Sequence, residues 1–204
     1  ANGIHDTGKP RQVITYPPWS EDDVRRAVEL SASRCRGWYV SITDDVLAPV
    51  WRASLEAHRR LGFAPLPFVE RGAGVRMQGD GPSSWTRSIS GARPRNKAFV
   101  KWGTLDGAYV MPPGADEGEA KRCIGGKPVW LLVRLITDYS KPGDVVLDYC
   151  AGYSTTGIAA KRTGRRAILI ESDEEAWAES ARRLARTPAQ EPIAEVERPP
   201  APRA

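Results

Sequence analysis

The stretch Asp144-Val145-Val146-Leu147-Asp148-Tyr149-Cys150-Ala151-Gly152, written DVVLDYCAG, decides the fold. Its β-branched and apolar run predicts a buried strand over 144–148, which ends at an acid followed by a turn. A helix is predicted over 155–163, closed by Gly164, then a strand over 166–170 and a helix over 173–185. This β-α-β-α order predicts an α/β fold with a parallel sheet covered by helices.

The turn that follows Asp148 is the predicted ligand site. Open α/β sheets bind ligands beyond the carboxyl ends of their strands, where a turn offers backbone amides and a helix N-terminus. Glu171 ends the next strand, and an acid about 20 residues after such a turn commonly takes the ribose hydroxyls of a nucleoside cofactor. The chain has no G-x-G-x-x-G pattern, so a nucleoside without a pyrophosphate fits better. The alternative is a plain strand-to-helix turn with a surface glutamate.

A second candidate site lies near the start of the chain, in the stretch VITYPPWS at 13–20. Pro17 and Pro18 cannot lie inside a central strand, because proline lacks the N–H that a sheet ladder needs. Their carbonyls are free to accept hydrogen bonds, and Trp19 can stack on a planar ligand such as a base. The alternative is an ordinary turn at a pair of prolines.

Positive charge is concentrated between Trp85 and Trp102. The whole chain has a formal net charge of +5 and a pI near 9.3, which allow a nucleic-acid partner without demanding one. The segment 85–102 contains no Asp or Glu, and its cations are Arg87, Arg93, Arg95, Lys97 and Lys101. This basic insertion is a candidate DNA-recognition loop, because its cations can follow phosphates and its tryptophans can stack. The alternative is a solvated hairpin whose tryptophans belong to the core.

The remaining elements complete a single domain, predicted over 11–186. They are a strand over 13–15, helices over 21–33 and 46–61, strands over 38–42 and 63–70, and a helix from Pro128 to Tyr139. Residues 1–10 are expected to form an irregular leader, and the proline-rich residues 187–204 a disordered tail.

Composition excludes several classes of protein. No apolar run is long enough to span a membrane, and no signal peptide is recognisable, so a cytoplasmic protein is predicted. Three cysteines without C-x-x-C spacing and two histidines far apart in sequence indicate neither a disulfide framework nor a zinc site, and no metal is expected.

Taken together, these motifs resemble those of one known family. Residues 127–184 are similar to the C-terminal half of the β-class DNA amino-methyltransferases, which transfer a methyl group from S-adenosylmethionine to adenine N6 or cytosine N4. Those enzymes have a Lys-Pro helix, then Asp-Pro-Phe-Ala-Gly-Ser-Gly-Thr-Thr, then a Glu that ends the next strand. The stretch VITYPPWS stands where they have Asp-Pro-Pro-Tyr or Ser-Pro-Pro-Tyr. The order of motifs is the circularly permuted order of that class, and the middle of the chain resembles compact phage-type members.

The resemblance implies a Rossmann-like methyltransferase fold, with a mostly parallel sheet and helices on both faces, and double-stranded DNA as the partner. It implies a prokaryotic or phage-encoded protein, for which a homodimer is one option. In the catalytic segment, which includes Pro18, Pro17 would supply the carbonyl acceptor, Trp19 would stack on a flipped base, and Tyr16 would take the polar position. The residues implied to bind the cofactor are Asp148, Tyr149, Ala151, Gly152, Thr155, Thr156, Glu171, Lys127 and Pro128.

The sequence also departs from the family at both motifs. Tyr16 replaces a short acceptor, and Tyr149 stands where the family has proline. Ser154 replaces the second glycine of the turn, where glycine permits close backbone approach. The leading hypothesis is a DNA methyltransferase acting on an exocyclic amine, with adenine N6 favoured over cytosine N4. The alternatives are a catalytically silent DNA-binding protein on the same scaffold and a related enzyme with another cofactor or acceptor.

Overall fold

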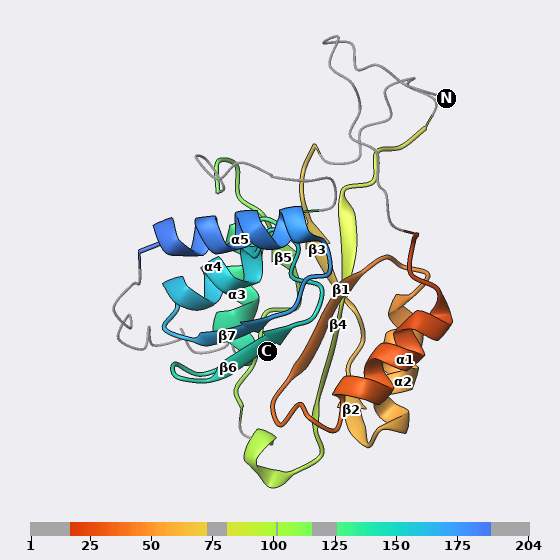
Figure 1. Cartoon of the computed structure of the whole chain (residues 1–204). Helices are drawn as coiled ribbons and strands as arrows, with labels where there is room; N and C mark the ends of the chain where they lie inside the picture. Colours follow the sequence, from red (N-terminus) through yellow and green to blue (C-terminus); the bar gives the residue numbers. More distant parts are fainter. Residues whose placement is uncertain (1–16, 73–80, 101, 116–125, 189–204) are drawn as a thin grey trace.

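The computed structural model describes residues 17–72, 81–100, 102–115 and 126–188, which form a mixed arrangement of helices and strands (Figure 1). The predicted leader, the predicted strand 13–15 and all but two residues of the predicted tail lie outside these ranges. In chain order the elements are α1 (Glu21–Ser31), β1 (Tyr39–Thr43), α2 (Ala48–Ala57), β2 (Arg60–Gly62), β3 (Leu66–Val69), β4 (Thr86–Pro94), the 3₁₀ helix η1 (Lys97–Phe99), β5 (Tyr109–Val110), α3 (Val129–Tyr139), β6 (Val145–Asp148), α4 (Thr155–Arg162), β7 (Arg166–Leu169) and α5 (Glu174–Arg186).

Strand β4 is the centre of a five-stranded sheet. It pairs with β1 on one side, while β2 and β3 lie end to end along its other side, and β5 pairs with β3. Side chains alternate between the two faces of a strand. Tyr39 of β1 therefore packs with α1 and α2, whereas Val40 and Ile42 pack with α3 and α4. Helices cover both faces of this sheet, as predicted.

Strands β6 and β7 form a second, parallel pair, aligned from Val145 opposite Arg166 to Asp148 opposite Leu169. Helix α4 connects the two strands and packs against α3 and α5. Neither α3 nor any other helix in the described ranges is long and apolar enough to cross a membrane.

The α/β class and the Rossmann-like fold are confirmed. Each element predicted over 144–185 occurs within one residue of its expected bounds. The sheet differs in one respect from the mostly parallel sheet that was expected, because β4 pairs antiparallel with β1, β2 and β3. The parallel pairings of the described strands are those of β3 with β5 and of β6 with β7. β2 and β3, which are joined by three residues, run in the same direction along β4 and both pair antiparallel with it.

Two predicted elements are shorter than expected, and both differences arise from β4. The helix predicted over 46–61 ends at Ala57, because Leu61 and Gly62 pair with β4 instead. The strand predicted over 63–70 is reduced to Leu66–Val69. The strand predicted over 38–42 and the helix predicted over 21–33 are confirmed as β1 and α1, and the hydroxyl of Ser20 caps α1 as expected.

The basic segment 85–102 is not the loop or insertion that its composition suggested. Most of it is β4, the most extensively paired strand of the described chain, followed by the short helix η1. Glycine, alanine and proline are poor strand formers, but the partners on both sides of β4 override these local preferences. The alternative of a solvated hairpin does not fit the paired strand either, although Trp102 does lie in an aromatic cluster.

One face of the β6–β7 pair remains open within the described part of the chain. Val145, Leu147, Ile168 and Ile170 are each about half exposed on that face. Parallel strands are normally covered on both faces. Within the described residues, helices therefore cover both faces of the five-stranded sheet, while α4 packs on one face of this pair.

Candidate active site

The turn that follows β6 is organised by the carboxylate of Asp148. Its Oδ1 accepts the backbone N–H of Cys150 at 2.9 Å, and its Oδ2 accepts the hydroxyl of Thr156 at 2.5 Å. These two bonds tie the end of β6 to the first turn of α4, which begins at Thr155. Asp148 therefore shapes the backbone of the predicted cofactor turn.

Glu171 approaches the same turn from the end of β7. Its Oε2 accepts the N–H of Gly152 at 2.7 Å, and its Oε1 accepts those of Ser172 and Asp173 at 2.8 and 2.9 Å. A carboxylate offers about four acceptor positions, so about one remains for a ligand hydroxyl. The parallel pairing of β6 and β7 thus brings the two predicted acids to one turn, as expected.

The space beside Gly152 is open. Its φ of +49° lies in the left-handed region that glycine adopts readily, and a Cβ added there would meet no atom within 4 Å. Gly157 has no such space, because a Cβ there would lie 2.6 Å from Leu169 and 3.0 Å from Leu184. Open space beside a carboxylate and a turn of backbone amides fits the nucleoside part of S-adenosylmethionine.

Ser154 stands where the family has its second glycine, and it keeps the backbone conformation of glycine, with φ of +64°. Its side chain is fully buried and points toward Gly157, so that its Oγ would lie 2.5 Å from a Cβ added there. The hydroxyl has no hydrogen-bond partner among the described residues. The substitution therefore places an unpaired hydroxyl in the core beneath the turn and does not narrow the space beside Gly152.

Replacing Ser154 by glycine is expected to stabilise the protein by about 1–2 kcal/mol. Glycine removes the left-handed backbone cost, about 1–2 kcal/mol, and the unpaired hydroxyl, about 1–3 kcal/mol, against a somewhat larger entropy loss on folding. Urea unfolding measures the change. Ser154→Ala is the control, because it removes the hydroxyl but keeps the backbone cost, and it should give a smaller gain. A glycine variant less stable than the original chain would contradict this prediction.

Tyr149 turns its side chain away from the turn and into the N-terminal half of the protein. Its hydroxyl is hydrogen-bonded to that of Tyr39, and its ring packs against the apolar cluster of α1, α2 and β1. Burial raises the pKa of Tyr149 above its usual value, so it is neutral at physiological pH. Burial, helped by nearby Asp148, also raises the pKa of the Cys150 thiol to about 11. The predicted contact of Tyr149 with the cofactor stays a prediction.

The other predicted cofactor residues flank the turn or begin α3. Ala151 is buried and donates its N–H to the carbonyl of Ile170 at 3.1 Å, which holds the turn against the end of β7. Pro128 is buried at the start of α3, and half-buried Lys127 precedes it. Their roles toward the cofactor stay predictions.

The Pro17-Pro18-Trp19 segment leads into α1. Both prolines are exposed, and Trp19 is 38% exposed. The ring of Trp19 stacks on Trp51 of α2, with centroids 5.8 Å apart and planes inclined by 25°. One face of Trp19 is therefore occupied within the protein. Tyr16 lies outside the described residues, and the catalytic roles of this segment stay predictions.

The cations of segment 85–102 whose side chains the structure describes, Arg87, Arg93 and Arg95, do not form one patch. Arg87 is exposed at the end of β4 that pairs with the carboxyl ends of β1 and β3. Arg93 lies six residues further along the strand, about 20 Å away, and it donates to the carbonyl of Pro94. Arg95 donates to the carbonyl of Arg60. The side chain of Lys97 and the whole of Lys101 lie outside the described part of the chain.

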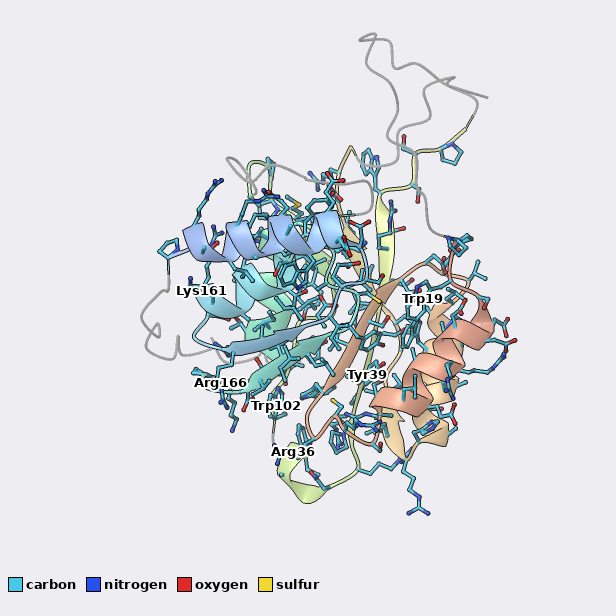
Figure 2. All side chains as sticks on the ribbon, viewed as in Figure 1. Trp19, Arg36, Tyr39, Trp102, Lys161 and Arg166 are labelled. Carbon is cyan, nitrogen blue, oxygen red and sulfur yellow. The ribbon has the colours of Figure 1, made fainter. Side chains whose placement is uncertain are left out.

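The far end of the segment lies at the amino end of β6, away from the predicted cofactor turn. The indole N–H of Trp102 donates to the carbonyl of Asp138 near the end of α3, and Lys141 lies over its ring. Trp38, just before β1, is 5.0 Å from Tyr139 and 6.2 Å from Trp102 between ring centroids. In Figure 2, Trp102 lies by strand β6, well away from Trp19. Trp102 thus belongs to an aromatic cluster, whereas Trp85 is 44% exposed.

Two side chains of α5 that the sequence analysis did not select also hold the turn. The hydroxyl of Ser180 donates to the carbonyl of Gly152 at 2.7 Å, and the guanidinium of Arg183 donates to the carbonyl of Tyr153. The two lie three positions apart, on one face of the helix. That spacing is the signal available in the sequence, and many surface helices share it.

The turn between β6 and α4 has the geometry expected of a nucleoside site in an α/β protein, and comparison shows what the chain is similar to. Residues 95–182 match the family described as DNA methylase, of the N6/N4 type. The resemblance inferred from the motifs is thereby confirmed, while the circularly permuted order stays a prediction.

Two bacterial relatives show the same similarity over short segments. The chain is 49% identical over 49 residues to the type II methyltransferase M2.DpnII of Streptococcus pneumoniae. It is 45% identical over 49 residues to the type II methyltransferase M2.LlaDCHI of Lactococcus lactis subsp. cremoris. In both cases the match covers 24% of this chain and 18% of the relative, so the chain spans less than a fifth of the curated relatives that it matches.

Solved structures share the fold over most of the chain. The M1.HpyAVI–SAM complex superposes with a TM-score of 0.64 at 21% identity, covering 80% of this chain and 81% of that one. TTHA0409 from Thermus thermophilus, complexed with S-adenosyl-L-methionine, gives a TM-score of 0.58 at 18% identity, covering 84% and 83%. The described residues therefore have the fold of these methyltransferase structures.

Proposed function

We propose that this protein is an S-adenosylmethionine-dependent DNA methyltransferase that methylates the exocyclic amine of a base flipped out of double-stranded DNA. The observation that carries the proposal is the meeting of Asp148 and Glu171 at the Gly152 turn, with open space beside it. The match to the N6/N4 DNA methylases supports the choice of an amine acceptor. Adenine N6 is proposed ahead of cytosine N4.

Each part of the site has a role in this reaction. S-adenosylmethionine would supply an activated methyl group on a positively charged sulfur. Glu171 would accept hydrogen bonds from the ribose hydroxyls, and Asp148 would keep the turn in shape. The carbonyl of Pro17 would accept a hydrogen of the target amine, which favours the geometry in which its lone pair can attack. Trp19 would stack on the flipped base with the part of its ring that Trp51 leaves free.

Incubation with labelled S-adenosylmethionine and mixed-sequence double-stranded DNA, followed by nucleoside mass spectrometry, tests the proposal. The expected product is N6-methyladenine, and N4-methylcytosine would correct the base while keeping the reaction. Reactions without DNA are the control. DNA binding without label in any nucleoside would favour the silent scaffold, and label in RNA alone would favour another acceptor.

The two ends of β4 give a test of where DNA lies. Arg87 lies beside the carboxyl ends of β1 and β3, and α/β sheets bind their ligands beyond the carboxyl ends of strands. Arg87→Ala is therefore expected to weaken DNA binding about three- to tenfold and to reduce its salt dependence by about one charge. Arg93→Ala is the matched control, with the same loss of charge at the opposite end of the strand, and it should change affinity less than twofold. Fluorescence anisotropy at several salt concentrations measures both. If both variants weaken DNA binding equally, DNA contacts both ends of β4.

The setting of the protein is part of the same proposal. Its curated relatives are bacterial, and we propose a cytoplasmic protein encoded by a prokaryote or a phage. A homodimer stays a prediction, which light scattering at several protein concentrations will test.

A further inference from the structure

Tyr149 makes a contact that its position in the turn does not require. It directly follows Asp148, where the related methyltransferases have proline, and proline has no hydroxyl. Its ring packs against the cluster that contains Val24 and Val28 of α1 and Leu55 of α2. A residue of the cofactor turn is therefore anchored in the opposite half of the protein.

The anchor is a chain of hydrogen bonds. The hydroxyl of Tyr149 bonds to that of Tyr39, and Tyr39 bonds to the hydroxyl of Ser31 at 2.9 Å. Ser31 then donates to the carbonyl of Ala27 within α1. Tyr39 is 7% exposed, and burial raises the pKa of both tyrosines, so the chain stays protonated through the physiological range. Bonds shielded in this way from water are stronger than exposed ones.

Aromatic contacts extend the connection to the Pro17-Trp19 segment. Tyr39 lies 5.9 Å from Trp51 between ring centroids, and Trp51 carries the stacked ring of Trp19. The side chains of Trp19, Trp51, Tyr39 and Tyr149 thus form a continuous path from the proposed base-stacking residue to the cofactor turn. Among the described strands, no backbone pairing joins β6 to β1, so side chains carry this connection.

We infer that Tyr149 and Tyr39 are positioning residues that hold the cofactor turn at a fixed place relative to the Pro17-Trp19 segment. This inference rests on the proposed function. The pair acts through the backbone that follows it: Asp148 and Glu171 hold Cys150 and Gly152 from one side, and Tyr149 holds the turn from the other. Without the tyrosine bond the turn samples more positions, and part of the cofactor's binding energy is then used to restore the right one.

The test uses Tyr149→Phe, Tyr39→Phe and the double variant, which remove hydroxyls and keep the rings. Each single variant is expected to weaken the binding of S-adenosylhomocysteine, measured by calorimetry, about three- to tenfold. The double variant should be no weaker than the worse single variant, because the two hydroxyls share one bond. Tyr109→Phe is the matched control. It removes a buried hydroxyl bond to Asp138, 2.8 Å long, at a place remote from the turn, so it should lower stability and leave affinity within twofold.

Amide hydrogen exchange provides a second readout that needs no cofactor. Exchange at Cys150, Ala151 and Gly152 should rise in Tyr149→Phe and stay unchanged in Tyr109→Phe. Unchanged exchange at these amides, or an affinity for S-adenosylhomocysteine equal to that of the original chain, overturns the inference. If the original chain itself binds no S-adenosylhomocysteine while the exchange result holds, the proposed function fails and the positioning of the turn stands.

Discussion

Replacing Glu171 by alanine is expected to weaken the binding of S-adenosylhomocysteine about a hundredfold. A hydrogen bond from a hydroxyl to an ionised carboxylate contributes about 1.5–3 kcal/mol, so the loss of the one ribose bond for which Glu171 has room accounts for about this factor. The variant also frees the N–H groups of Gly152, Ser172 and Asp173, which the carboxylate now accepts. Isothermal titration calorimetry measures the affinity, and urea unfolding shows how much of the loss comes from stability.

Glu175→Ala is the matched control for this experiment. Glu175 lies in the first turn of α5 and is exposed, so the variant removes the same charge close to the site without removing a contact of the turn. Its affinity should stay within twofold of the original. Equal affinities for Glu171→Ala and Glu175→Ala would remove Glu171 from the cofactor site.

The region around this site is also where sequence reasoning was most accurate. The strands and helices over 144–186 follow local signals: β-branched runs for the strands, Asp173 as the N-cap of α5, and Gly164 after α4. Each element there is connected to the next by a few residues. The parallel pairing of β6 with β7, and with it the meeting of Asp148 and Glu171, followed from their order alone.

Strand β4 shows where local signals fail. Thr86–Pro94 contains Arg87, Gly91 and Arg93, which taken alone indicate a solvated loop. It forms a strand because β1, β2 and β3 pair with it, and the first residue of β1 lies 53 positions before its partner Ala92. Pairing partners so distant in sequence leave no local pattern. The same pairing shortened the predicted helix 46–61, since Leu61 opposes Arg93 in the sheet.

Side-chain directions within the site were beyond sequence reasoning for a different reason. Tyr149 and Ser154 both depart from the family's motif, and the sequence does not tell which way either side chain points. In the folded chain both side chains point away from the space beside Gly152. Tyr149 packs against the apolar cluster of α1, α2 and β1 and bonds to the buried hydroxyl of Tyr39. Ser154 has a left-handed backbone, and its side chain points toward Gly157. The rotamer of a turn residue depends on neighbours that only the folded chain brings together.

The largest effect on stability is expected at Arg60, which the sequence analysis did not select. Its side chain is 4% exposed, and its guanidinium donates to the carbonyls of Ala32, Cys35 and Gly37. These carbonyls lie at the C-terminal end of α1 and in the loop that leads to β1. The end of a helix carries partial negative charge, and unpaired carbonyls there need donors. One buried cation thus fixes the whole connection between α1 and β1, and with it the place of Tyr39.

Arg60→Met is therefore expected to lower the free energy of unfolding by about 3–5 kcal/mol, because methionine fills much of the volume but leaves three carbonyls without their donor. Urea unfolding followed by circular dichroism measures the loss. Arg36→Met is the matched control: Arg36 is exposed in the same loop (Figure 2), and its variant should change stability by less than about 0.5 kcal/mol. One hydrogen bond contributes about 1 kcal/mol. If the free energy of unfolding of Arg60→Met lies within about that amount of the original value, water has replaced the guanidinium at those carbonyls. The packing of Tyr39 and Trp51 then holds the loop before β1 instead.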